Sequence, residues 1–420
     1  MSERKDDDAP RSAAVGRRLL ARVRSMDGLH GAAGAFRRRL RRGELGSAPA
    51  VLGLIVIWIV FQSLDSAFLS PRNLTNLSVD SVGLGMIAVG VVFVLLIGEV
   101  DLAVGSVSGL SAAVFVVLNV DHGLPEWLAV VFAVLSGAGM GAVHGFVFAR
   151  IGVPSFAVTL AGLLAWNSLM IYVLGAMGTV NFDDTGLVAQ LTSRSFDHDA
   201  VAYGLAALVA AAFFLASYRD GRRREAAGTP ARPPAEIVAR TAVIAVVAFA
   251  AAYVLNRFRG VPLAPLIFLV VVAGLDYVLR GTPYGRRVYA LGGSTVATRR
   301  AGISLVVTRI SVFVVSGTMA AIGGLFLASR ITSVSQLSGQ GILVINAIAA
   351  AVIGGTSLFG GRGRTWSALL GVLVIQSIAS GMALLDTQVA VQFLITAGVL
   401  LVALINDSLT RRSQQIHGRL

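Results

Sequence analysis

The chain has 420 residues, of which 55% are hydrophobic and 14% charged, and its mean hydropathy is +0.78. Soluble domains carry about 25% charged residues and have no core large enough for so many long apolar stretches, so the composition excludes a soluble globular protein. The net charge of +13 comes from basic clusters that lie between the apolar stretches, which indicates membrane topology and not a nucleic-acid groove. Because the chain has no cysteine, disulfides, thiolate metal sites and cysteine nucleophiles are excluded.

The N-terminal part of the chain is polar and basic up to about Ala48. It is too long for the n-region of a cleaved signal, so the first apolar block is expected to be a retained anchor. We therefore predict a cytoplasmic tail at 1–48. The stretch Arg17–Arg42 has two interpretations, a basic amphipathic helix on the anionic inner leaflet or a disordered tail that sets topology.

Twelve apolar blocks follow, most of them near the ~20 residues that a membrane-spanning helix needs. They predict an all-α fold, a polytopic helical bundle of about ten core helices plus an extra pair, with the membrane domain at 49–407. The shorter blocks are candidates for broken or re-entrant helices. The blocks are Ala50–Phe68, Val82–Ile97, Ala103–Leu118, Trp127–Phe148, Phe156–Leu174, Val201–Ser217, Ile237–Leu255, Pro265–Leu279, Ile310–Leu327, Ile342–Ile353, Trp366–Leu385 and Val389–Ile405.

The basic residues predict an orientation for these blocks. If both termini lie inside, 30 lysines and arginines fall on the cytoplasmic side and five fall outside, as the positive-inside rule favours. The arrangement places cytoplasmic loops at 218–237 and 281–306 and a cytoplasmic tail at 408–420. An acidic cluster then lies in an outer loop, with Asp183, Asp184, Asp197 and Asp199 as its members.

The sequence contains no standard ATP-binding loop. A Walker A motif needs a lysine beside the nucleotide phosphates, and the only lysine is Lys5 in the tail. Any ATP that drives this protein must therefore be bound by another subunit. The sequence also lacks the HExxH and GxSxG motifs, and its five histidines are scattered, so we predict no catalytic residue, cofactor or metal site.

The segment Gly98–Ser106 interrupts an apolar run with two carboxylates, Glu99 and Asp101. Carboxylates beside a membrane segment usually face water, a cavity or a partner, so one interpretation places both on a translocation pathway. The other makes Asp101 the N-cap of a helix that begins near Leu102. Both require a broken helix at this point.

The same glycine spacing appears a second time in the chain. Ile97-Gly98-x-x-x-Leu102-x-x-Gly105 recurs as Ile353-Gly354-x-x-x-Leu358-x-x-Gly361. Duplicated interruptions are typical of transporters with a site between two repeats. A chance coincidence in a chain with 47 glycines is the alternative.

The segment Tyr284–Ile303 is a long polar and basic stretch between the later apolar blocks. After Gly293 it predicts a short helix, capped by Ser294 and ending near Gly302. Such a helix on the membrane face is suited to dock on an ATPase and transmit its motion. An ordinary basic loop with a surface helix is the alternative.

Several polar residues lie within or beside the apolar blocks and are candidates for the pathway. Amides can hydrogen-bond a neutral ligand without placing a charge in the membrane, but they can equally cross-link helices. With the two carboxylates, the candidate pathway residues are Glu99, Asp101, Ser106, Asn167, Asn346 and Gln376.

Several of these segments resemble the ribose and xylose permeases of binding-protein-dependent ABC importers. The resemblance covers Ala50 to about Asp407, and the extra apolar pair and Arg259-Gly260-Val261-Pro262 make it closest to the xylose type. Members often have Asn at the position of Ser294 and Gly-Gly-Ile-Asp where this chain has Gly98-Glu99-Val100-Asp101. The segments are Leu69–Asn76, Glu99–Ser106, Val153–Gly162, Tyr284–Ile303 and Ala347–Leu358.

The resemblance implies an ABC permease that pairs with a second copy, docks ATP-binding subunits and receives sugar from an extracytoplasmic binding protein. The ATPase-docking residues would be Gly292, Gly293, Ser294, Ala297, Arg299, Arg300, Gly302 and Ile303.

We therefore expect a multi-pass cell-membrane permease for xylose or a related pentose. An ion-coupled secondary transporter is a second hypothesis, disfavoured because the carboxylates lie at segment ends and not in mid-helix. A membrane-embedded glycosyltransferase is a third, for which Asp183, Asp184, Asp197, His198 and Asp199 are the candidate site.

Overall fold

The computed structural model describes residues 48–175, 178–228 and 233–416. The stretch Arg17–Arg42, with its two interpretations, lies outside these residues. The all-α prediction is confirmed. The elements are α3 (Ala48–Leu64), α4 (Pro71–Leu96), α5 (Val104–Val116), η1 (Val117–Asp121), α6 (Glu126–Phe146), η2 (Val147–Ile151), α7 (Ser155–Leu174), β1 (Thr179–Asn181), α8 (Leu187–Ser193), β2 (Ser195–Phe196), α9 (Asp199–Ala226), α10 (Pro234–Asn256), β3 (Val261–Pro262), α11 (Leu263–Gly281), α12 (Pro283–Gly293), α13 (Thr295–Arg300), α14 (Leu305–Ile331), β4 (Ser333–Ser335), α15 (Leu343–Ile353), α16 (Thr365–Leu384) and α17 (Val389–Ile416).

Each of the twelve predicted blocks forms a helix. Within the described residues, nine helices, two of them continued by π-helical turns, are long and apolar enough to cross a membrane. Helix α4 begins earlier than its predicted block, at Pro71, because its first turns are polar and carry no apolar signal. The Ser70 hydroxyl accepts a hydrogen bond from the Asn73 amide, and Pro71 at the first helical position fixes a helical φ.

The two predicted cytoplasmic loops contain more helix than expected. The segment 218–237 is mostly the ends of α9 and α10, extended by ion pairs one turn apart such as Asp220–Arg224. The segment 281–306 contains the unpredicted α12, which begins after the cap Thr282, and the predicted short helix α13. At the C-terminus, α17 continues into the predicted tail as far as Ile416.

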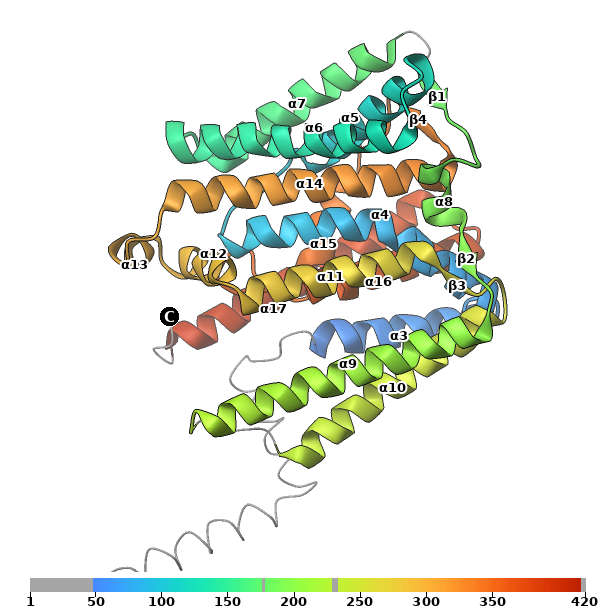
Figure 1. Cartoon of the computed structure of the whole chain (residues 1–420), viewed down its shortest axis with the longest axis vertical. Coiled ribbons are helices and arrows are strands. Elements are labelled where there is room, and N and C mark those ends of the chain that lie inside the picture. Colours follow the sequence, from blue (N-terminus) through green and yellow to red (C-terminus); the bar gives the residue numbers. More distant parts are fainter. Residues whose placement is uncertain (1–47, 176–177, 229–232, 417–420) are drawn as a thin grey trace, which may run out of the picture. The chain divides into compact units, whose positions relative to one another are not determined.

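The helices of the membrane domain lie side by side, with their connections gathered at two ends (Figure 1). We call the end with α12 and α13 the α12 end, and the end with α8 and the four short strands the strand end. The strands form two antiparallel pairs, β1 with β4 and β2 with β3. The predicted inner loops 218–237 and 281–306 share the α12 end, opposite the predicted outer loop around Asp183.

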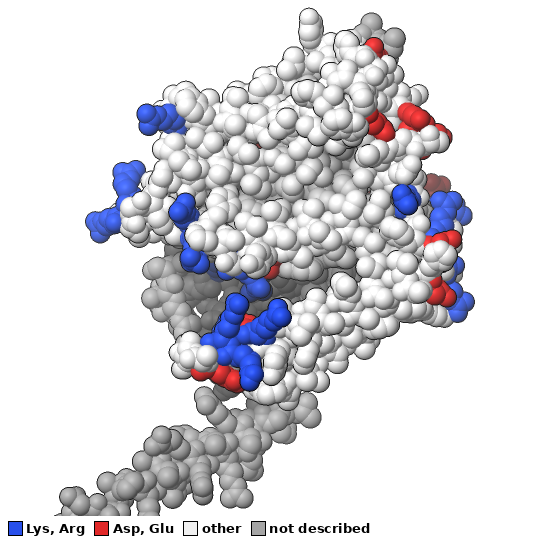
Figure 2. Space-filling model, in the orientation of Figure 1, with Lys and Arg blue, Asp and Glu red and all other residues white. Residues whose placement is uncertain are grey.

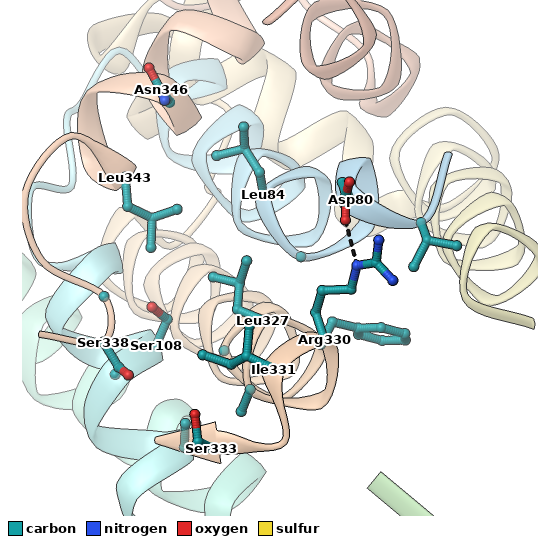
Figure 3. Close-up of a pocket in the computed structure, with 18 of the residues that line it drawn as sticks. Asp80, Leu84, Ser108, Leu327, Arg330, Ile331, Ser333, Ser338, Leu343 and Asn346 are labelled. Carbon is teal, nitrogen blue, oxygen red and sulfur yellow. Dashed lines mark hydrogen bonds and ion pairs between the residues drawn. The ribbon is translucent and has the colours of Figure 1, made fainter. Parts of the chain in front are cut away.

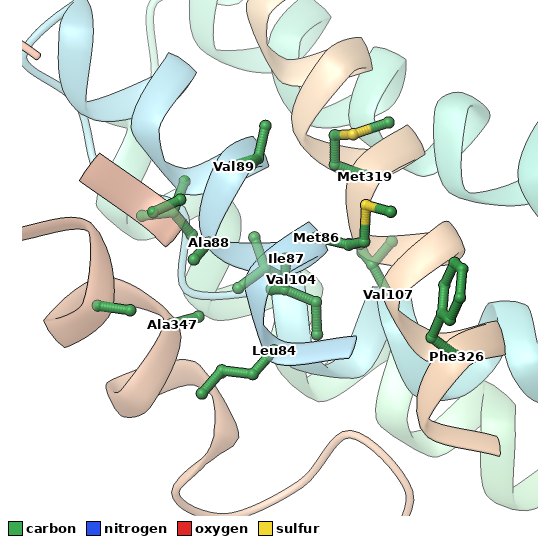
Figure 4. Packing of buried hydrophobic residues seen from close by; sticks show 14 of the residues in the cluster. Leu84, Met86, Ile87, Ala88, Val89, Val104, Val107, Met319, Phe326 and Ala347 are labelled. Atoms are coloured by element: carbon green, nitrogen blue, oxygen red, sulfur yellow. The ribbon is translucent and has the colours of Figure 1, made fainter. Parts of the chain in front are cut away.

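Helix α4 is the central element of the core. Its side chains are buried on every face from Ser81 to Leu96, whereas most helices expose one side. Figure 4 shows Leu84, Met86 and Ile87 of α4 among side chains from α5, α14 and α15. A helix that is apolar all round needs such enclosure on all sides.

The extra pair α9 and α10 forms a peripheral hairpin. Three of its few buried side chains, Ala202, Ala206 and Ala252, belong to a small separate cluster with Val261 of β3. Apolar side chains such as Val243 and Val246 are exposed. A broad band without charged side chains separates the two ends on the face shown in Figure 2, as a lipid-facing surface requires.

Candidate functional site

A pocket of about 430 Å³ lies between α4, α5, α14, the β4–α15 connection, α15 and α16 (Figure 3). Its volume falls in the range of small-molecule sites, roughly 300–1,000 Å³. Apolar side chains such as Leu84, Leu327 and Leu343 form much of its wall. The polar lining residues are Asp80, Ser108, Arg330, Ser333, Ser338, Asn346 and Gln376.

Small residues bring the β4–α15 connection against α5 on one side of the pocket. A side chain at Gly109 of α5 would meet the Ser338 carbonyl at 2.2 Å, so only glycine fits there. Gly339 has a φ of +77° and turns the connection back along α5. These two glycines allow Ser338 and Gly339 to line the pocket.

An ion pair lies where the pocket opens. Two of the lining residues are exposed, Arg330 and Ile331, and both belong to the last turn of α14 at the strand end. Arg330 Nε donates to Asp80 Oδ1 of α4 at 2.6 Å, and its Nη2 donates to Asn76 Oδ1 at 3.3 Å. Sequence reasoning missed this pair, because it treated Arg330 only as an outer charge.

Asn346 and Gln376 are the predicted pathway residues that line the pocket. Asn346 Oδ1 is buried and has no hydrogen-bond partner in the structure. Figure 3 shows Asn346 and Arg330 on opposite sides of the pocket. A buried amide oxygen without a partner is costly, and a rotation of the Asn346 side chain toward a ligand donor in the pocket would satisfy it.

Asn167, Ser106 and Glu99 do not line the pocket. Asn167 lies on α7 and also has a buried, unpartnered Oδ1. The Ser106 hydroxyl donates to the Ala103 carbonyl within its own turn. Glu99 Oε2 accepts a hydrogen bond of 2.6 Å from the Ser155 hydroxyl in the first turn of α7, where the helix dipole favours a carboxylate.

Asp101 has a buried structural role that differs from the predicted N-cap. Helix α5 is capped at Ala103, without a side-chain bond, so the predicted cap is wrong. Asp101 Oδ1 instead accepts from the Ala103 amide at 3.0 Å, in a local turn before the helix. Its Oδ2 accepts from the Ser316 hydroxyl of α14 at 2.9 Å, which ties the interruption to α14.

A second buried contact that the sequence did not reveal joins α6 and α7. Trp166 Nε1 donates to His144 Nε2 at 2.8 Å. The two residues are 22 positions apart on different helices, so no local pattern marks them as partners.

The two glycine interruptions lie side by side and contact α12. The Gly361 amide donates to the Leu96 carbonyl at 2.8 Å. A side chain at Gly360 would come within 2.9 Å of the Gly98 nitrogen, and one at Gly292 of α12 would come within 1.8 Å of the Leu96 carbonyl oxygen. Backbone contacts therefore link both interruptions to α12, which together with α13 holds the predicted docking residues and is called the docking element below.

Helices α12 and α13 present the predicted docking residues at one end of the bundle. Ser294 caps α13 by accepting from the Ala297 amide at 3.2 Å, as predicted, and Gly302 follows the helix with a φ of +74°. Arg299 and Arg300 are exposed, Ile303 is half-buried, and Gly293 has open space around it.

The Tyr289 hydroxyl of α12 donates to the Gly363 carbonyl at 2.8 Å. This hydrogen bond adds a second link between α12 and the connection from α15 to α16, residues 354–364, which contains the second glycine interruption and is called the 354–364 interruption below. Burial raises the pKa of Tyr289, so it remains a protonated donor at neutral pH.

Fold and site together define a multi-pass membrane protein with a pocket inside a helical bundle. The family described as "Branched-chain amino acid transport system / permease component" matches residues 73–404. The chain belongs to this permease family. No solved structure matches the chain significantly.

Curated relatives match over nearly their whole length. The xylose transport system permease protein XylH of Escherichia coli (strain K12) is 36% identical over 86% of this chain and 91% of its own. XylH of Haemophilus influenzae (strain ATCC 51907 / DSM 11121 / KW20 / Rd) is 33% identical over 86% and 96%, respectively. The ribose import permease protein RbsC of the same strain is 30% identical over 85% and 91%.

Substituting Asn346 tests whether the pocket binds the transported molecule. We expect Asn346→Ala to lower uptake about tenfold, the equivalent of losing one hydrogen bond in the pocket. Asn167→Ala is the matched control, since its Oδ1 is equally buried and unpartnered but lies outside the pocket. Initial uptake rates in proteoliposomes, normalised to reconstituted protein, would measure both. Equal losses in the two variants would contradict a binding role for Asn346.

Proposed function

We propose that this chain is the membrane-spanning permease subunit of an ABC importer that carries xylose or a related pentose into the cell. The observation that carries the proposal is the 36% identity to a xylose permease over 86% of this chain. The pocket, with amides and hydroxyls among its polar lining residues, suits a neutral sugar. The chain supplies the path, and ATP is hydrolysed on a partner.

The proposal assigns one partner to each end of the helical bundle. The α12 end is the cytoplasmic side in this proposal, and α12 with α13 is the docking site for the ATP-binding subunit. The strand end then faces outside and receives the sugar-binding protein. A second copy of the chain completes the transporter. The pathway runs through the pocket, and Asp101 supports it as a positioning residue that holds the interruption against α14.

Transport in proteoliposomes tests this function. With the sugar-binding protein present, radiolabelled xylose uptake is expected to require both ATP and the ATP-binding subunit, and to fall to background when either is omitted. Full-rate uptake by the chain alone would contradict the proposal. Uptake that follows a proton or sodium gradient would instead establish an ion-coupled transporter. Competition by a series of unlabelled pentoses and hexoses would then rank the substrates.

A further inference from the structure

The ion pair at the pocket opening joins the two longest helices that line the pocket. Asp80 belongs to the third turn of α4 and Arg330 to the last turn of α14. Ion pairs such as Asp220–Arg224 stabilise a single helix, whereas Asp80–Arg330 holds two separate helices together. The pair lies beside Ile331, an exposed residue of the pocket lining.

Glycines shape much of the remaining α4–α14 contact. A side chain at Gly323 of α14 would lie 2.7 Å from the Gly83 carbonyl oxygen, and one at Gly90 would lie 2.9 Å from the Ser316 carbonyl oxygen. The backbones therefore approach closely, and the side chains of Ile87 and Leu327 occupy the space left by Gly323 and Gly83 on the facing helix. The Asp80–Arg330 pair adds a polar contact at the end of this close packing, where the pocket opens.

Both helices lead from the pair to the docking element. Helix α14 begins at Leu305, directly after α13, and runs without interruption to Arg330. Helix α4 runs from Asp80 to Leu96, whose carbonyl oxygen contacts the Gly292 position of α12 and accepts from Gly361. A displacement at the α12 end that shifts one of these helices more than the other would move Asp80 and Arg330 relative to each other.

We propose that Asp80 and Arg330, assisted by Asn76, form a latch that restricts access to the pocket at the strand end and separates when α4 and α14 shift. The latch rests on the proposed function, because it assigns the strand end as the entrance for sugar. Exposed fractions of 32% for Asp80 and 41% for Arg330 suit this role. Partly exposed ion pairs contribute little to stability, so the pair can break and re-form in each cycle.

The absence of cysteine from the natural sequence allows a direct test. Asn346→Cys places a single thiol in the pocket, and Leu337→Cys places one at a side chain that is 76% exposed. Each cysteine substitution is introduced into the full chain, and the protein is reconstituted in nanodiscs. The rate at which a charged maleimide labels the single thiol is then measured. Neither a sugar, a partner nor a known orientation is needed. A failed latch can therefore be distinguished from a failed transport function.

Asp80→Asn and Arg330→Gln are each expected to raise the labelling rate of Asn346→Cys about two- to fivefold, the factor expected from losing a partly exposed ion pair. Labelling of Leu337→Cys should stay unchanged. The exchange of both residues, Asp80→Arg with Arg330→Asp, should return the rate toward that of the parent. The latch would be overturned if neither single substitution changed the labelling rate. It would also be overturned if the chain with both residues exchanged were labelled as fast as the single variants.

A salt series on the Asn346→Cys chain leaves Asp80 and Arg330 unchanged, so it does not depend on whether the latch variants fold. Because screening weakens a partly exposed pair, labelling of Asn346→Cys should accelerate between low salt and about 1 M salt. Leu337→Cys corrects for any effect of salt on the reagent. A parent rate that does not change relative to this control would also overturn the proposal.

Discussion

Replacing Gly292 with alanine is expected to lower ATP-dependent uptake by more than about tenfold. The added Cβ would lie 1.8 Å from the Leu96 carbonyl oxygen and 2.6 Å from the Gly361 nitrogen. Both are backbone atoms, so α12 must move away from α4 and from the 354–364 interruption. Displacing packed segments in this way typically costs about 1–3 kcal/mol. Here it would also break the contact through which the docking element reaches α4.

Gly293→Ala is the matched control for this substitution. Gly293 is the next residue of the same helix, and nothing lies within 4 Å of its Cβ position. Since both changes replace glycine with alanine in one helix, their effects on helix propensity are similar and favourable. Gly293 is also a predicted docking residue, so any loss of transport in Gly293→Ala would come from docking, and it should be much smaller than the loss in Gly292→Ala.

Uptake and co-purification of the ATP-binding subunit would be measured on both glycine variants. If only the contact with α4 is lost, Gly292→Ala should retain the partner while losing transport. Equal uptake by the two variants would show that α12 does not act through Leu96.

Local features of this chain were predictable from the sequence, whereas contacts between distant segments were not. The α13 cap at Ser294 lies within four residues of the amide it binds, so its signal is local. The interruption at Gly98 was likewise visible as glycine and two carboxylates in an apolar run. Its contact with Gly360 depends on how α4, α15 and α16 pack.

The candidate site shows the same division. Asn167 and Asn346 are equivalent in the sequence, since each is a single amide in an apolar block. Only the packing of α7 and α15 places one outside the pocket and the other on its wall. Asp80 and Arg330 lie at the polar ends of their helices, where charges are ordinary, so no local pattern distinguished them from solvated residues.

Replacing Asp101 with alanine is expected to have a large effect on both stability and transport. The side chain is 3% exposed, and its two oxygens accept from the Ala103 amide and the Ser316 hydroxyl. Asp101→Ala would leave both donors buried without a partner, at a cost of about 1–3 kcal/mol each. We therefore expect a lower thermal unfolding temperature together with reduced transport.

Asp101→Asn should be much milder. Its amide oxygen can still accept from Ala103, and its NH₂ group can donate to the Ser316 hydroxyl, which accepts as well as donates. Asp183→Ala is the control for removing an aspartate, since the side-chain hydrogen bonds of Asp183 are local ones, from Thr185 in the predicted outer loop. Its effect should stay within about 0.5 kcal/mol. Unfolding in detergent, followed by tryptophan fluorescence, should rank the stabilities as parent, Asn and then Ala.

A double substitution separates the cross-link from a general effect of burial. Ser316→Ala alone leaves Asp101 Oδ2 without its donor and should destabilise the chain. In the Asp101→Ala background the same change removes an already unpartnered hydroxyl, so its additional cost should be near zero or negative. Residues in direct contact are expected to deviate from additivity in this way. Additive losses would show that Asp101 and Ser316 act separately, and that the interruption is held to α14 by other contacts.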